Sequence, residues 1–106
     1  MAKYLFQAQY SADGLKGLIK ETGSGRKKAV SKAISAAGGK VESFYFSFGC
    51  SDAVLVVDLP DNISAAALAV SVSSTGAVRI NTTPLLTAEE MDKAIEKGFG
   101  YRPPGA

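Results

Sequence analysis

The sequence predicts an α+β fold: a ferredoxin-like plait with a four-stranded antiparallel sheet, in which strands and helices follow the order βαββαβ. Three observations lead to this fold class: two apolar strand patterns joined by a short turn within residues 40–59, a helical pattern on either side of them, and one more strand pattern beyond each helix. An extra helix is expected near the C-terminus. In this topology the first and third strands are central and both crossover helices cover one face of the sheet, so the other face stays open.

The first strand is expected over residues 3–10, where apolar and polar side chains alternate. Ser11 is a suitable N-cap for the helix that follows. The helical pattern is interrupted at residues 22–25, because each of the two glycines there costs about 1 kcal/mol in a helix interior. It resumes at residues 30–37 and ends at residues 38–39, which are both glycine. We therefore expect either a kinked helix or two helical pieces with a break near the glycines.

The second and third strands form a hairpin whose turn is Gly49-Cys50-Ser51-Asp52. Residues 43–48 alternate between polar and aromatic side chains, which places three phenylalanines, the last of them Phe48, on one face of the second strand. The third strand is apolar without a break over residues 53–57, so both of its faces are expected to be covered. A central strand in an oligomer has this pattern, and dimerisation through the open sheet face would explain it.

The last third of the chain predicts two helices and one strand. Asp61 or Asn62 is a suitable N-cap for an alanine-rich helix, and the fourth strand is expected over residues 77–86. A capping box at residues 87–90 begins the final helix, which runs to Lys97. We therefore expect one domain over residues 1–97, followed by an irregular tail at residues 98–106 that lies on a partner subunit.

Composition narrows the function classes. A chain of 106 residues with 46% hydrophobic and 21% charged residues suits one soluble globular domain. No apolar run approaches the roughly 20 residues of a membrane span, and the N-terminal residues lack the pattern of a signal peptide, so we expect a cytoplasmic protein with no membrane association. The net charge of +2 gives little reason to expect nucleic acid as a partner.

The chain contains no histidine and a single cysteine, Cys50. The commonest protein metal ligand and the commonest general base are therefore both missing. One thiol can form neither an internal disulfide nor a site that needs two or more thiolates. We expect no metal site and no cofactor.

Five short motifs carry a resemblance to a known family: Gly14-Leu15-Lys16 after Tyr10, Gly38-Gly39-Lys40, Ser43-Phe44-Tyr45, the turn Gly49 to Asp52, and Gly76-Ala77-Val78-Arg79. Over nearly the whole chain to Lys97, the sequence resembles the GYD-domain family of the dimeric α+β-barrel superfamily. The resemblance implies the fold and a dimer, and it carries no established biochemical activity. The family is named for a Gly-x-Tyr-Asp turn, and here Ser51 replaces the tyrosine. Any function that depends on that tyrosine is not expected in this chain.

Two residues of the hairpin turn are candidates for a site. Asp52 and Cys50 would lie at the mouth of a barrel, where loop residues often meet ligands. The alternative is structural: Asp52 bonds backbone amides of its own turn, and Cys50 is a small filler. A nucleophilic Cys50 would also need a base, and the chain has no histidine to supply one.

Polar residues of the strands form a second candidate set. If they lie on the open face, they would line a pocket between subunits that orients a small anionic or carbonyl ligand, with Arg79 suited to bidentate carboxylate contacts. The alternative is an interface network or solvent exposure, because charges in a sheet interface must be paired. The set comprises Gln7, Gln9, Tyr45, Asp58, Arg79 and Asn81.

A glycine-rich basic segment at residues 23–28 has some features of a phosphate cradle, since glycines before a helix expose backbone amides. It lacks the spacing of a P-loop and follows no strand, so a solvated basic turn is the favoured interpretation. With Lys32 it could also contact nucleic acid, but no aromatic residues are interleaved with the charges.

The first functional hypothesis is a homo-oligomeric, cofactor-free binding or structural module that dimerises through its open sheet face. The alternative is a cofactor-independent monooxygenase or isomerase acting on a small carbonyl or phenolic compound. In that enzyme Asp52 would take a proton and Arg79 would stabilise an enolate, with Tyr45 and Gln7 completing the site. The enzyme needs a water-accessible cavity that contains Asp52 or Arg79 in a strongly perturbed environment, and a barrel filled by side chains without such a cavity would exclude it.

Overall fold

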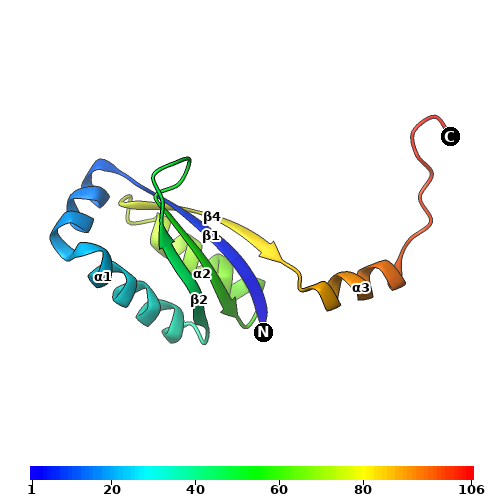
Figure 1. Cartoon of the computed structure of the whole chain (residues 1–106), viewed down its shortest axis with the longest axis horizontal. Coiled ribbons are helices and arrows are strands. Elements are labelled where there is room, and N and C mark those ends of the chain that lie inside the picture. The colour runs from blue at the N-terminus through cyan, green and yellow to red at the C-terminus, as the bar shows by residue number, and fades with distance from the viewer.

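The structure is a computed structural model that describes all residues of the chain, 1–106. Its elements are, in order, β1 (Ala2–Tyr10), α1 (Ala12–Ala36), β2 (Lys40–Phe46), β3 (Ala53–Leu59), α2 (Asn62–Ser73), β4 (Val78–Leu85) and α3 (Ala88–Lys97) (Figure 1). The four strands form one antiparallel sheet in the order β2-β3-β1-β4. The predicted α+β class, the βαββαβ order and the two central strands are confirmed.

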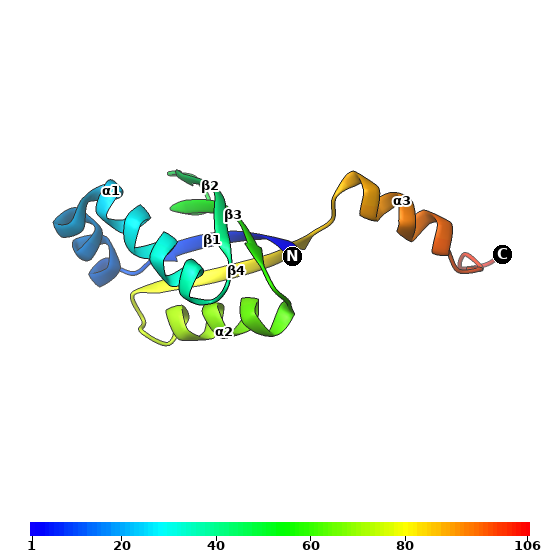
Figure 2. The ribbon, with the colours of Figure 1, turned by 90° about the horizontal axis from the view of Figure 1, so that it is seen from below.

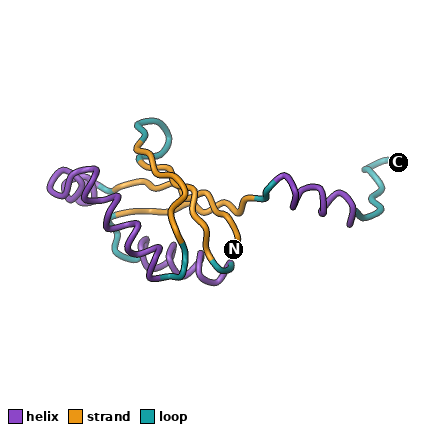
Figure 3. The backbone as a smooth tube through the Cα atoms, turned by 60° about the horizontal axis from the view of Figure 1, so that its bottom comes forward, coloured by secondary structure: helices purple, strands orange, loops and turns teal.

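The core lies between one face of the sheet and the helices α1 and α2, which sit together on that side of the strands (Figures 2 and 3). Alternation along the strands decides which residues enter it. Tyr4 and Phe6 of β1 and Val57 of β3 are at most 5% exposed. Ile34 of α1 and Ala65 of α2 close the core from the helix side. A single continuous core of 10 buried residues results, as expected for one domain.

Helix α1 consists of two helical pieces, which was one of the two predictions; the other was a single kinked helix. The break is at Thr22, whose φ of +72° and ψ of 166° are not helical. Thr22 also begins the second piece, because its hydroxyl accepts a hydrogen bond from the main-chain N–H of Gly25 at 3.3 Å. The helix ends as predicted: Gly38 has a φ of +86°, a left-handed conformation that favours glycine.

The hairpin loop is longer than predicted. Strand β2 ends at Phe46, opposite Ala53, and Phe48 lies outside the strand with its side chain fully exposed. The expectation that Phe48 shares a strand face with the two phenylalanines before it is therefore wrong. The reason lies in the backbone hydrogen bonds: the N–H of Ser47 donates to the carbonyl of Asp52 at 2.9 Å, which closes a wide loop over residues 47–52.

The C-terminal arm stands away from the sheet (Figures 1 and 2). Helix α3 begins with the predicted capping box of Thr87 and Glu90, and none of its residues is buried. The arm lengthens the molecule to 57 Å along its longest axis and gives a radius of gyration of 16.7 Å, against about 13 Å for a compact chain of this size. Residues 98–106 are irregular, as predicted.

Candidate functional site

The open face of the sheet brings together three of the predicted site residues. The strand register places Tyr45 opposite Val54, Val54 opposite Gln7, and Gln7 opposite Asn81. One row across all four strands therefore contains Tyr45, Gln7 and Asn81, on the face that neither α1 nor α2 covers. The side chain of Tyr45 is 70% exposed there.

Arg79 lies one row further along the same face, directly opposite Gln9. Its guanidinium forms no hydrogen bond and no ion pair within the chain. The amide of Gln9 is already engaged, because its Nε2 donates to the carbonyl of Cys50 at 2.6 Å and so holds the hairpin loop against β1. Arg79 is thus the free cationic group at this end of the sheet.

Asp52 directs its carboxylate at the backbone of β1. Its Oδ2 accepts a hydrogen bond from the main-chain N–H of Tyr10 at 2.8 Å, and its own N–H donates to the carbonyl of Ala8 at 2.8 Å. These bonds join the residue before β3 to the end of β1, and they engage one of the two carboxylate oxygens. The carboxylate therefore bonds the backbone of β1 rather than the amides of its own turn, which the structural alternative predicts. The neighbouring Cys50 is exposed.

A network of charges closes the opposite end of the open face. The ammonium of Lys3 lies 2.8 Å from the carboxylate of Glu42 and 2.9 Å from that of Asp58. These two hydrogen bonds, with Glu42 as the larger effect, raise the pKa of Lys3 above its usual 10.5. The Asp58 side chain is only 10% exposed, so its charge is buried and paired.

Between the charged network and the polar row, the two central strands of the open face carry apolar side chains, flanked by Thr83 of β4 and Ser43 of β2. Leu5 lies opposite Val56, and Val54 lies in the adjoining row. All three side chains are half-buried by their neighbours, and no other element of the chain covers them. The second face of β3, which the sequence predicts to be covered, is therefore uncovered within one chain.

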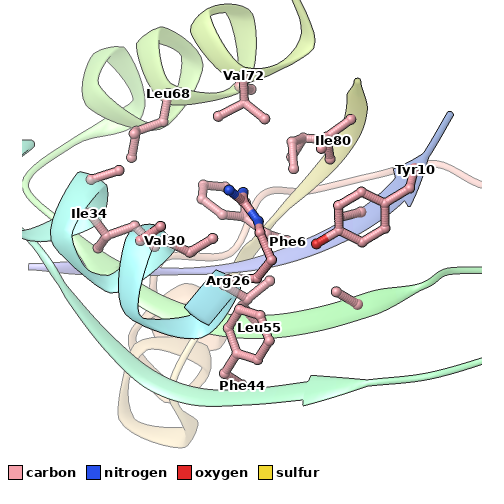
Figure 4. Close-up of a pocket in the computed structure, with 16 residues that line it drawn as sticks. Phe6, Tyr10, Arg26, Val30, Ile34, Phe44, Leu55, Leu68, Val72 and Ile80 are labelled. Carbon is pink, nitrogen blue, oxygen red and sulfur yellow. The ribbon is translucent and has the colours of Figure 1, made fainter. Parts of the chain in front are cut away.

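A separate cavity of about 230 Å³ lies between the sheet and the helices (Figure 4). Every element except α3 contributes to its wall. Of the 16 lining residues 15 are hydrophobic, so the cavity can receive an apolar group but offers few hydrogen bonds. The larger lining side chains are Phe6, Phe44, Leu55, Leu68, Val72 and Ile80.

Arg26 is the one charged residue in the wall of this cavity. Figure 4 shows its guanidinium among the apolar side chains, with the hydroxyl of Tyr10 also directed inward. The Nη1 atom lies 3.3 Å from the carboxylate of Glu21, whereas the Nε atom is buried and has no hydrogen-bond partner. A buried N–H without an acceptor is costly, so this atom identifies the cavity as a candidate site.

Residues 23–28 are helical, so the expected basic turn is wrong as a backbone conformation. Lys27 and Lys28 are exposed, as a solvated segment predicts, whereas Arg26 is partly buried and its Nε atom is fully buried. The signal that could have revealed Arg26 is helical spacing. Arg26, Val30 and Ile34 are separated by steps of four, which places them on one face of the second piece of α1. Val30 and Ile34 pack in the core, and Arg26, on the same face of the helix, lines the cavity beside them.

The residues proposed for an enzyme are not gathered around one cavity. The apolar cavity is lined by neither Asp52 nor Arg79. Arg79 instead borders a second hollow of about 570 Å³ at the ends of β1 and β4, together with Gln9 and Tyr10. The chain brings together no cluster of three metal-ligating side chains, and none of its helices has the length and apolarity of a membrane span.

Comparison with known proteins gives one match. The family model described as the GYD domain matches residues 4–95, from β1 into α3. No curated protein and no solved structure matches the chain. The match covers all of the sheet except the first two residues of β1, both core helices and most of the arm helix.

Proposed function

The chain belongs to the GYD-domain family, and from that premise we propose that it is a homodimeric binding module whose two subunits join through the open faces of their sheets. The observation that carries the proposal is the apolar centre of that face. Leu5, Val54 and Val56 form it, and nothing within the chain covers them. Half-buried apolar side chains that no other element covers, surrounded by polar residues, are typical of a contact surface.

A second copy of the chain is the partner that suits this surface. In a twofold dimer the same patch occurs on both subunits, so an apolar centre meets an apolar centre. At the charged end of the face, the carboxylates of Glu42 and Asp58 share the one ammonium of Lys3, and Lys3 and Glu42 remain partly exposed, so this network would lie at the rim of the interface. Burial of an unpaired carboxylate would oppose association far more strongly than burial of this network.

The polar row of Tyr45, Gln7 and Asn81 gives the proposed interface its binding function. Together with Arg79 it would line a pocket between the two sheets, as the first functional hypothesis expects. Arg79 has no partner within its own chain, so it is available to a carboxylate of the other subunit or of a small ligand. The amide side chains of Gln7 and Asn81 can both donate and accept, which suits a carbonyl group.

The C-terminal arm supports an oligomer independently. Met91 and Ile95 lie one helical turn apart on α3 and are 49% and 71% exposed, and Leu86 before the helix is also exposed. Such a stripe of apolar residues normally faces another element. We propose that the arm packs against the second subunit, which would bury the stripe.

A charge placed at the centre of the open face tests the dimer. Sedimentation velocity at micromolar concentration is expected to give the wild type about twice its monomer mass of 11.0 kDa. Val56→Glu should sediment as a monomer, because two facing carboxylates would be buried without partners. Val70→Glu is the matched control: Val70 is 68% exposed on α2, away from the open face, and this variant should remain a dimer.

Circular dichroism should show the same secondary structure for all three proteins. A monomeric wild type, or a Val56→Glu variant that still dimerises, would overturn the proposal.

A further inference from the structure

We propose that the cavity between the sheet and the helices binds a small monocarboxylate with an apolar body, and that Arg26 holds the carboxylate. This site is distinct from the proposed pocket between subunits, because all the residues that line it belong to one chain. It therefore does not depend on the dimer.

The guanidinium of Arg26 has one edge available for an anion. Two buried side-chain atoms of the chain lack a hydrogen-bond partner, the Nε of Arg26 and the hydroxyl of Thr82, and only Arg26 lines the cavity. Glu21 engages Nη1, which leaves the edge formed by Nε and Nη2. This edge binds a carboxylate side-on through two parallel N–H···O bonds.

The side chains of the cavity wall determine the polarity of the rest of the ligand. With 15 of 16 lining residues hydrophobic, a molecule that fills the cavity must be apolar except where it meets Arg26. Glu21 already engages Nη1, so the guanidinium offers the ligand two parallel N–H donors on its remaining edge, which match the two oxygens of one carboxylate. A phosphate group carries up to two charges and three strongly hydrated oxygens, and most of these would lose their water without gaining a partner here. The cavity thus favours a monocarboxylate over a phosphate ester.

Tyr10 provides a second polar contact from the other side of the cavity. Its hydroxyl makes no hydrogen bond within the chain and points inward (Figure 4). A phenolic O–H can donate to a carboxylate oxygen, which would hold the anion between Tyr10 and Arg26. The hydrogen bond to Asp52 fixes the main chain of Tyr10, so the backbone that carries the hydroxyl is already positioned without a ligand.

The volume limits the size of the apolar body. An apolar cavity of about 150 Å³ engineered into another protein binds benzene, and pockets for drug-sized molecules begin near 300 Å³. At about 230 Å³, this cavity is larger than the first and smaller than the second. It therefore suits one aromatic ring or one short branched chain that carries an acid group.

Isothermal titration with phenylacetate, benzoate and 3-methylbutanoate tests the proposal, with phenylacetamide as the uncharged counterpart of phenylacetate. We expect saturable binding of at least one acid at one molecule per chain, and binding of phenylacetamide about tenfold weaker or less. Arg26→Gln should weaken binding of the acid about tenfold, and Tyr10→Phe should weaken it by a smaller factor. Lys27→Gln removes the same charge from an exposed neighbour and should change the affinity less than about twofold.

Three results would overturn the proposal: no saturable binding of any of the acids up to about 10 mM, equal affinity of phenylacetate and phenylacetamide, or equal losses in Arg26→Gln and Lys27→Gln. The thermal midpoints of the variants without ligand show whether each is folded. The monomeric Val56→Glu variant should bind the acid as the wild type does. Loss of binding in that variant would place the acid at the dimer interface and contradict a site within one chain.

Discussion

The main-chain N–H of Tyr10 donates a hydrogen bond to the carboxylate of Asp52 at 2.8 Å. Tyr10 ends β1 and lines the apolar cavity, and Asp52 closes the hairpin loop just before β3. The Asp52 side chain thus connects the loop between β2 and β3 to β1, the strand whose Tyr10 hydroxyl points into the cavity. Asp52 thus has a structural task as a hydrogen-bond acceptor for the backbone of β1.

Replacement of Asp52 by alanine should lower the free energy of unfolding by about 1.5–3 kcal/mol, the usual contribution of a hydrogen bond to a charged group. Asp52→Asn retains an oxygen acceptor and should lose less. Urea unfolding followed by circular dichroism measures both values. If Asp52→Ala is as stable as the wild type, the bond to Tyr10 does not contribute to folding.

Two glycines of α1 should respond to alanine in opposite ways. A Cβ atom at Gly14 would collide with the carbonyl oxygen of Ala77, which Ser11 also holds through a 2.9 Å hydrogen bond. We expect Gly14→Ala to cost about 2 kcal/mol or more in unfolding free energy. A Cβ at Gly17 meets nothing within 4 Å, so Gly17→Ala should stabilise the protein by about 0.5–1 kcal/mol. Equal effects of the two substitutions in urea unfolding would contradict this packing.

The break in α1 predicts that glycine is preferred at position 22. Thr22 has a φ of +72° and a ψ of 166°, a conformation that costs a residue other than glycine about 1–3 kcal/mol. Thr22→Gly removes this strain but also removes the hydroxyl that accepts from Gly25, and it adds freedom to the unfolded chain. The net change expected is a gain of about 1 kcal/mol. Thr22→Ala retains the strain without the cap and should be less stable than the wild type. A higher melting temperature for Thr22→Ala than for Thr22→Gly would contradict the strained conformation of Thr22.

The N-cap of α2 predicts a loss of stability in acid. Asp61 accepts a hydrogen bond from the main-chain N–H of Ser64 at 2.9 Å, and this bond lowers the pKa of Asp61 below its usual 3.8. A carboxyl group whose pKa is lowered by folding contributes its stability fully above the unfolded value. It loses that contribution as the pH falls through the folded value, so the effect lies below pH 3.8.

Asp61→Asn should separate capping from titration. Asparagine caps a helix about as well as aspartate but carries no titratable group. At neutral pH the variant and the wild type should melt at similar temperatures, and below pH 3.8 the melting temperature of the variant should fall less steeply. Parallel curves for the two proteins would show that other carboxyl groups control acid unfolding.

Local signals in the sequence predict most of this fold. The cap at Asp61, the capping box of Thr87 with Glu90 and the left-handed Gly38 each depend on residues a few positions apart, and all three occur in the structure. The failure at Phe48 is of another kind. Alternation continues in the sequence to Phe48, but the strand ends earlier because Asp52 bonds to β1 and to Ser47. Contacts with a third strand decide that boundary, and no pattern within the hairpin contains them.

The candidate sites could be predicted only in part. That Tyr45, Gln7 and Asn81 share a row follows from three strand pairings between residues far apart in the sequence, and a shift of one residue in any of them would break the row. Arg26 has the helical spacing of Val30 and Ile34, but it stands beside Lys27 and Lys28, and a run of basic residues on a helix is usually solvated. The charges therefore favour a surface position over the inward one that the spacing indicates.

The position of β1 in the middle of the sheet has a consequence for the growing chain on the ribosome. Synthesis proceeds from the N-terminus, so β1 emerges before both of its neighbours: β3 follows α1 and β2, and β4 follows α2 as well. Both edges of β1 therefore lack partners until β3 has emerged, and the second edge is fully paired only when Leu85 has appeared. Nascent copies on neighbouring ribosomes would expose the same unpaired edges to one another during that interval.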